Sequence, residues 1–244
     1  MKSVKRIILL LTMLLGGSQA IYAHAIWLES HPSGTKNTPH VVRVFYGEYA
    51  TGEIDATKDW YSDMKELTVQ FVGPNQKLQT LKLEDKGDFL EGTFLPTEDG
   101  LYHVFTSHAA KDLGGETRYE FVSQTRVKVG EGKDLPAIPL GDLPAIPLGH
   151  QLVIDAKIPP VGARVPLLLT KDGSPVVEKE ILVMSSEGWS KSYKTDQNGE
   201  ILIEALWPGK YVVEYSHMQQ QEGVWHDKPY KKNWQGLTTS FMVE

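Results

Sequence analysis

The segment Ile201-Leu-Ile-Glu-Ala-Leu-Trp-Pro-Gly-Lys-Tyr-Val-Val-Glu-Tyr215 contains two short runs of β-branched and aromatic residues, joined by a proline and a glycine. Runs of this composition are typical of β-strands, and Pro-Gly is typical of the turn between them. The same pattern recurs from Val41 onward, with almost no apolar spacing of helical period. The sequence therefore predicts an all-β protein.

Turn residues divide the chain into many expected strands. In the first half we expect strands at residues 41–46, 67–72, 77–83, 89–95, 101–106 and 121–129. In the second half we expect them at residues 151–157, 165–170, 180–184, 190–195, 201–205, 210–215 and 237–243. Residues 54–64 have mixed polarity and predict a short helix or an ordered loop. The connection over residues 217–236 is long for a compact domain, which favours a functional loop.

A tandem repeat interrupts this series of strands. The octet Asp-Leu-Pro-Ala-Ile-Pro-Leu-Gly occurs at residues 134–141 and again at 142–149. Two prolines per octet favour an extended, stiff backbone, so we predict a linker at residues 131–150, with a proline-rich docking ligand as the alternative. The linker would join two β-sandwich domains, residues 24–130 and residues 151–244. The second is expected to be immunoglobulin-like, because its closely spaced strands and turns resemble those of small sandwich modules in secreted bacterial proteins.

The first residues predict export. Lys2, Lys5 and Arg6 precede an apolar run at residues 7–15, which is the pattern of a signal peptide and is too short to span a bilayer. Cleavage after Ala23 would remove residues 1–23 and leave His24 as the first residue. Cleavage after Ala25 is the alternative, since Ala23-His24-Ala25 also fits the cleavage pattern. We therefore expect a periplasmic or secreted protein.

The net charge and the lack of cysteine exclude several classes of binding partner and site. Without residues 1–23 the chain has 22 basic and 31 acidic residues, a formal charge of −9 with histidine neutral. This charge argues against nucleic acid or anionic lipid as partners and is compatible with cations. The absence of cysteine excludes disulfides, zinc–thiolate sites and thiol catalysis. We found no serine-hydrolase elbow, zinc-protease helix or phosphate-binding loop, so we predict a protein that is not an enzyme and has peripheral or no membrane contact.

Histidines are the candidate metal ligands. His24 as a mature N-terminus would chelate a metal through its α-amine and its imidazole, a nitrogen-rich arrangement that suits nickel or copper. His103 is expected on one strand face with Leu101 and Phe105, opposite Tyr102 and Val104. The candidates to complete the site lie on or just after expected strands, and they are His103, His108 and His217.

A resemblance to a known family supports this prediction. The segments His24-Ala-Ile-Trp-Leu-Glu29, Val44-Phe-Tyr-Gly-Glu48 and Trp207-Pro-Gly-Lys-Tyr211 resemble a family of secreted bacterial proteins associated with nickel and cobalt uptake. The resemblance covers most of residues 24–244. It implies a periplasmic metal-binding component that works with a membrane transporter, with His24 and His217 as the best-matching ligands and His108 as a looser match.

The start of the expected mature chain has a second resemblance. The segment His24-Ala-Ile-Trp-Leu-Glu-Ser-His-Pro32 is similar to the start of periplasmic copper-resistance proteins of the CopC type, which are β-sandwiches with an N-terminal histidine ligand. The chain has no clear counterpart of their later Asp-x-His pair. This departure favours nickel or cobalt over copper.

The sequence thus predicts an exported protein that binds nickel or cobalt during uptake. The first alternative is a glycan-binding or protein-binding module whose contact surface is formed by Trp225, Tyr230 and Trp234. The second alternative is a copper protein with an N-terminal histidine brace.

Overall fold

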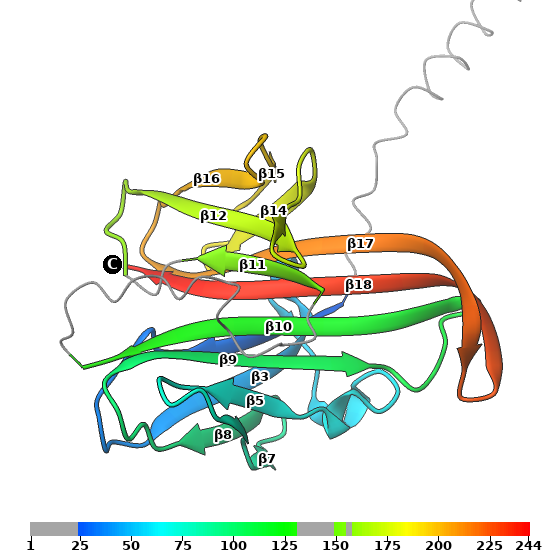
Figure 1. The fold of residues 1–244 in the computed structure, drawn as a ribbon, viewed down its shortest axis with the longest axis horizontal. Coiled ribbons are helices and arrows are strands. Elements are labelled where there is room, and N and C mark those ends of the chain that lie inside the picture. Colours follow the sequence, from blue (N-terminus) through cyan, green and yellow to red (C-terminus); the bar gives the residue numbers. More distant parts are fainter. Residues whose placement is uncertain (1–23, 131–148, 155–157) are drawn as a thin grey trace, which may run out of the picture.

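The computed structural model describes residues 24–130, 149–154 and 158–244 (Figure 1). The strands of the first half are β1 (Ala25–Ser30), β2 (Ser33–Gly34), β3 (His40–Glu48), β4 (Glu53–Ile54), β5 (Val69–Val72), β6 (Leu78–Thr80), β7 (Leu83–Asp85), β8 (Leu90–Phe94), β9 (Gly100–Ala109) and β10 (Thr117–Val129). Those of the second half are β11 (His150–Ile154), β12 (Arg164–Lys171), β13 (Ser174–Pro175), β14 (Glu180–Ser185), β15 (Ser190–Lys194), β16 (Glu200–Glu204), β17 (Gly209–Trp225) and β18 (Lys228–Val243). The predicted all-β fold is confirmed.

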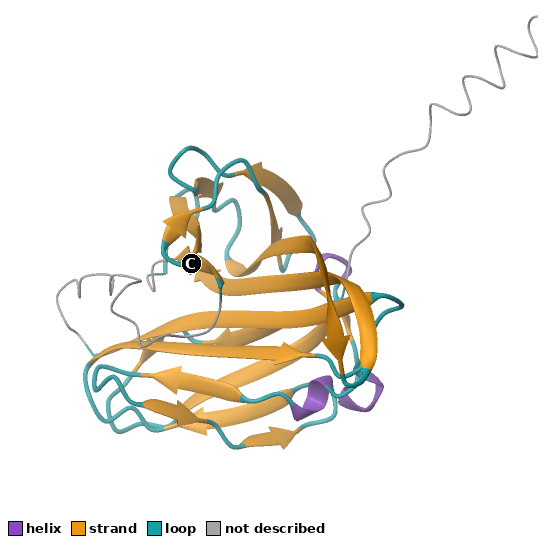
Figure 2. Cartoon of the chain, turned by 45° about the vertical axis from the view of Figure 1, so that its right-hand side comes forward, coloured by secondary structure: helices purple, strands orange, loops and turns teal. Residues whose placement is uncertain are grey.

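The strands form three sheets. A nine-stranded sheet, here called the central sheet, has the order β15-β14-β17-β18-β10-β9-β5-β6, with β2 paired to β10. A five-stranded sheet has the order β1-β3-β8-β7, with β4 on β3, and a four-stranded sheet has the order β11-β12-β13, with β16 on β12. The long strands β17, β18, β10 and β9 run side by side through the middle of the molecule (Figures 1 and 2).

One strand pair joins the two halves of the chain. β10 runs parallel to β18, in a register that extends from Thr117 opposite Lys232 to Gln124 opposite Thr239. The two sandwiches therefore share one continuous sheet, although each has a hydrophobic core of its own. The division at residues 131–150 stays a prediction, since residues 131–148 lie outside the described residues and His150 already begins β11.

The two faces of the central sheet pack against different partners. On the face here called the β1 face, Ser123 accepts a hydrogen bond from the backbone N–H of Leu28 in β1, at 2.9 Å, and Thr238 donates one to the carbonyl of Ile26, at 2.7 Å. On the opposite face, here called the β11 face, the Gln124 amide donates to the carbonyl of Leu152 in β11. Adjacent residues of one strand point to opposite faces, so β10 contributes side chains to both cores.

The second half contradicts one prediction. Residues 217–236 are not a loop, because β17 and β18 continue through them as a β-hairpin with a bulge between Gln220 and Gly223. Its two turn residues, His226 and Asp227, have φ of 46° and 64°, the positive values that a type I′ hairpin turn requires. Residues 219–222 are exposed, so no apolar alternation marked them as strand.

Two smaller differences concern the first half. β1 was not predicted, and the single strand expected at residues 77–83 is two strands, since β6 belongs to the central sheet and β7 to the five-stranded sheet. Residues 54–64 are an ordered loop that contains the one-turn 3-10 helix Thr57–Asp59 and leads into another, Met64–Glu66. Within the described residues, no helix is long and apolar enough to cross a membrane.

Candidate metal site

Three strands bring His24 next to two carboxylates. Gly47 of β3 lies opposite Ala25 of β1 on one side and opposite Ile54 of β4 on the other. A Cβ atom at Gly47 would lie 2.3 Å from the carbonyl oxygen of Glu53, so this close approach requires glycine. The short return from β3 through the 3-10 helix Tyr49–Thr51 to β4 therefore places Glu53 beside the start of β1.

The side chains of His24, Glu53 and Asp55 form the group. Each offers one ligand atom, and these atoms all lie within 4.8 Å of one another. The Nε2 atom of His24 is 3.4 Å from Oδ2 of Asp55, and the backbone N–H of Asp55 donates to the carbonyl of Tyr46 at 3.0 Å. The His24 side chain is 43% exposed, so solvent ions can reach it. An imidazole with two carboxylates is a donor set that divalent transition metals accept.

Two further carboxylates lie behind this group. Burial raises the pKa of Glu48, and a hydrogen bond from the backbone of Ala50, followed by the charge of His24, partly opposes that rise. Burial, and secondly the charge of Glu48, raise the pKa of Glu214 to about 7. The surroundings of His24 are therefore rich in acidic groups, an arrangement that attracts cations.

His103 lies on the opposite face of the central sheet from this group. It is 2% exposed, and its ring centroid is 5.6 Å from that of Phe105. Burial, together with the charge of Arg126, lowers its pKa to about 3. This environment keeps His103 neutral at ordinary pH and closes it to solvent.

His108 is held by a carboxylate of a neighbouring loop. Its Nε2 is 3.1 Å from Oδ1 of Asp63, which also accepts a hydrogen bond from the backbone N–H of Lys111 at 2.9 Å. Burial alone would raise the pKa of Asp63, but these two hydrogen bonds outweigh it and hold that pKa below its ordinary value. This arrangement fastens the loop before Met64–Glu66 to the end of β9.

His217 pairs with another histidine. Its ring centroid is 5.2 Å from that of His150, whose Nδ1 is 2.9 Å from Oε1 of Gln235. Burial is the main cause that lowers the pKa of both imidazoles. His150 was not among the predicted site residues, because in the sequence it stands 67 positions before its partner and directly after the proline repeat.

The structure thus separates the four predicted histidines. Within the described residues, the group of three or more ligand side chains contains His24 but not His103, His108 or His217. The partners of His24 are Glu53 and Asp55, which sequence reasoning missed as ligands. They lie 29 and 31 positions after His24 in a loop whose acidic residues look solvated, and only the pairing of β3 with both neighbours reveals them.

Two of the three aromatic residues proposed as a contact surface, Trp225 and Trp234, are engaged in packing. Trp234 is 8% exposed and belongs to the core of the first sandwich. Trp225 donates to the carbonyl of Ala110 at 2.8 Å, and the Arg118 guanidinium lies 4.4 Å from its ring centroid. Trp225 therefore fastens the hairpin to β10 and the end of β9.

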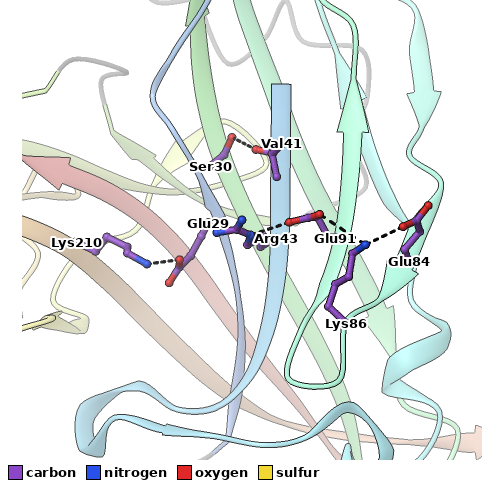
Figure 3. Close-up of polar contacts among 8 residues, drawn as sticks. All are labelled: Glu29, Ser30, Val41, Arg43, Glu84, Lys86, Glu91 and Lys210. Carbon is purple, nitrogen blue, oxygen red and sulfur yellow. Dashed lines mark hydrogen bonds and ion pairs between the residues drawn. The ribbon is translucent and has the colours of Figure 1, made fainter. Parts of the chain in front are cut away.

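Charged residues also cross the outside of the five-stranded sheet in a row, here called the charge ladder (Figure 3). It runs from Lys210 to Glu29, from Arg43 to Glu91 at 2.9 Å, and from Lys86 to Glu84 at 2.9 Å. Neighbouring side chains alternate in sign, so their charges are matched within the row. This region has no excess charge that would attract a metal ion.

Comparisons with known proteins add little to this site. No family model and no curated protein matches the chain. Among solved structures it is similar to Escherichia coli alpha-2-macroglobulin activated by porcine elastase, with 9% identity and a TM-score of 0.31. The match covers 88% of this chain and 20% of that one, so the chain spans about a fifth of the length of the structure it matches.

Proposed function

We propose that this protein is exported and binds a divalent transition metal ion, nickel or cobalt, through His24, Glu53 and Asp55. Cleavage after Ala23 would add the α-amine of His24 to the donor set, giving two nitrogen and two carboxylate ligands. The ion would be cargo in metal uptake, delivered to a membrane transporter. This last step rests on the resemblance at residues 24–29, 44–48 and 207–211.

The observation that carries the proposal is the approach of three ligand atoms to within 4.8 Å of one another at the start of the described chain. The hydrogen bond from Asp55 to Tyr46 and the pairing of β4 with β3 hold the two acidic residues in place. Metal binding requires deprotonated ligands. Affinity should therefore fall on acidification, as protons compete for the imidazole and the amine.

Copper is the second candidate ion. Copper(II) binds most imidazole sites more tightly than nickel or cobalt does. A histidine brace also needs a second imidazole, and the group around His24 supplies carboxylates instead. Donor type does not separate these three ions, so the resemblance at residues 24–29, 44–48 and 207–211 is the reason to place nickel and cobalt first.

The test is a metal titration of the exported protein, purified without chelator and first weighed intact to establish its N-terminus. We expect a chain that begins at His24 and binds one nickel or cobalt ion. Loss of a residue that only orients a ligand costs 10-fold to 100-fold in affinity. We therefore expect the metal affinity to fall at least about 100-fold in His24→Ala, and also in the double variant Glu53→Gln with Asp55→Asn.

A matched control is His226→Asn, which removes an exposed imidazole at the hairpin turn and keeps a residue that tolerates positive φ. Its affinity should equal that of the wild type. Unchanged affinity in His24→Ala, or a mature chain that begins at Ile26, would overturn the proposal.

A further inference from the structure

A pocket of about 510 Å³ opens beside His24 on the β1 face of the central sheet. Its lining consists of His24, Tyr46, Tyr61, Gly114, Tyr119, Phe121, Glu214, Ser216, Met218 and Trp234. Half of these residues are tyrosine, phenylalanine or tryptophan. Among the described residues, no lysine or arginine lines the pocket, and Glu214 is its carboxylate.

The aromatic rings form a continuous wall. Each ring contacts the next in the series Tyr46, Phe121, Trp234, Tyr119 and Tyr61. The successive centroid distances are 5.9, 5.3, 5.6 and 6.1 Å, and the interplanar angles lie between 64° and 89°. Neighbouring rings are therefore turned steeply toward one another and meet edge to face.

The surrounding core fixes this wall before any ligand arrives. Tyr46 and Phe121 are 5% and 4% exposed and belong to the same core cluster as Trp234. The Tyr61 hydroxyl donates to the carbonyl of Asp112 at 2.9 Å. Gly236 makes room for the indole, because a Cβ atom there would lie 2.2 Å from the Trp234 ring. A preorganised wall lowers the cost of binding.

The acidic side of the pocket comes from β17. Glu214, Ser216 and Met218 are spaced by two on this strand and so share one face, opposite Thr238, Gly236 and Trp234 of β18. Glu214 therefore lies along the same pocket as the rings, on the neighbouring strand. Aromatic faces carry partial negative charge and attract cations. A carboxylate beside several such faces is complementary to a positively charged group with an apolar surface.

We propose that this pocket binds a small organic cation of the methylated or quaternary ammonium class, with the aromatic wall around its methyl groups and Glu214 as its counter-ion. A free metal ion would instead keep its hydration shell or choose the oxygen and nitrogen ligands of His24, Glu53 and Asp55. At about 510 Å³ the pocket has room for a trimethylammonium group and for a further part of a ligand. The pocket shares His24 with the proposed metal site, but this inference can be tested with the metal removed.

The experiment titrates the full mature protein, in excess chelator and above pH 7, with choline and with its uncharged isostere, in which a quaternary carbon replaces the nitrogen. Binding is followed by calorimetry and by the intrinsic tryptophan fluorescence of the protein. We expect choline to bind at least about tenfold more tightly than the isostere, since the two differ in charge and hardly in shape. Equal binding of the two, or no choline binding at millimolar concentration, would overturn the proposal.

Variants locate the counter-ion. Glu214→Gln should weaken choline binding at least about tenfold and leave the isostere unchanged. Glu222→Gln is the matched control, because it removes one negative charge from an exposed position of the same strand. Equal effects of the two substitutions on choline binding would assign the attraction to net charge and overturn the role of Glu214.

Tyr119→Leu tests the aromatic wall, because it replaces a partly buried ring of that wall. It should weaken the binding of choline more than that of the isostere, and an equal loss of binding would contradict a cation–aromatic contact.

Discussion

Two buried carboxylates on one face of the central sheet and three histidines on the other respond to burial in opposite ways. On the β1 face, burial raises the pKa of Glu48 and of Glu214. On the β11 face, burial lowers the pKa of His103, His150 and His217. Burial always disfavours the charged form, which is the base form of an acid and the acid form of an imidazole. The carboxylates therefore lower the stability of the fold as the pH rises, and the histidines lower it as the pH falls.

The two faces also differ in how far solvent and ions can reach their buried groups. The acidic face opens into a pocket and lies beside an exposed histidine, so its buried charge can be compensated by a cation. His103, on the other face, is enclosed at 2% exposure. A histidine is thus a stronger candidate ligand where carboxylates and solvent reach it than where it is enclosed in a core. His24 meets this condition and His103 does not.

The largest expected effect comes from removing the enclosed imidazole. The folded protein keeps His103 neutral with a pKa of about 3, whereas the unfolded chain takes up a proton below about pH 6.5. The unfolded state therefore binds more protons between these values, and stability falls as pH falls through this range. At pH 5 the cost is about 2 kcal/mol, at 1.36 kcal/mol per pH unit. His103→Leu should not show this loss of stability, because leucine does not bind a proton.

Urea unfolding of both proteins at pH 5 and above pH 7 checks this prediction. The leucine variant should gain about 2 kcal/mol over the wild type on going from the higher pH to pH 5. His226→Asn, at an exposed turn, serves as the control and should follow the wild type. Parallel stability curves for His103→Leu and wild type would show that His103 titrates as it does in water.

The sequence predicted which side chains of β9 share a face, but not what each face packs against. Tyr102 and Val104 pack in one core cluster and Phe105 in the other, which confirms the predicted alternation. Alternation cannot tell that both faces are covered, because that depends on β10 pairing with β18 more than a hundred residues away. The acidic neighbours of His24 were missed for the same reason, since long-range pairing and not spacing brings these side chains together.

Glu214→Gln tests the opposite face and should have an effect of similar size. The folded protein holds a proton on Glu214 up to about pH 7, whereas the unfolded chain releases it near pH 4.5. The folded state binds more protons in this range, so stability falls as pH rises through it. Glutamine cannot ionise. We expect the variant to be about 2 kcal/mol more stable than wild type above pH 7, less than the full shift gives because solvent reaches the pocket.

The measurement is the same pair of unfolding curves, recorded above pH 7 and at pH 4. At pH 4 the two proteins should be equally stable, because the carboxyl group is then protonated in both states. The double variant His103→Leu with Glu214→Gln should show both changes additively, since distant sites on opposite faces do not couple. A stability difference that persists unchanged at pH 4 would contradict an ionisation effect and indicate altered packing.

The smallest effect is expected on the outside of the five-stranded sheet, where charges are exposed and matched. Arg43 and Glu91 are paired at 2.9 Å, with side chains 48% and 24% exposed. Exposed ion pairs contribute about 0 to 1 kcal/mol, and salt screens them. Arg43→Gln should therefore lower stability by about 0.5 kcal/mol in low salt and by less in high salt. Unfolding in urea at two salt concentrations measures this change in stability. A loss above about 2 kcal/mol that does not depend on salt would contradict the prediction. It would mean that Arg43 stabilises the protein mainly through packing against Phe89. The charge ladder can be altered at little cost because water already compensates its charges, whereas the two buried faces depend on pH because water is excluded from them.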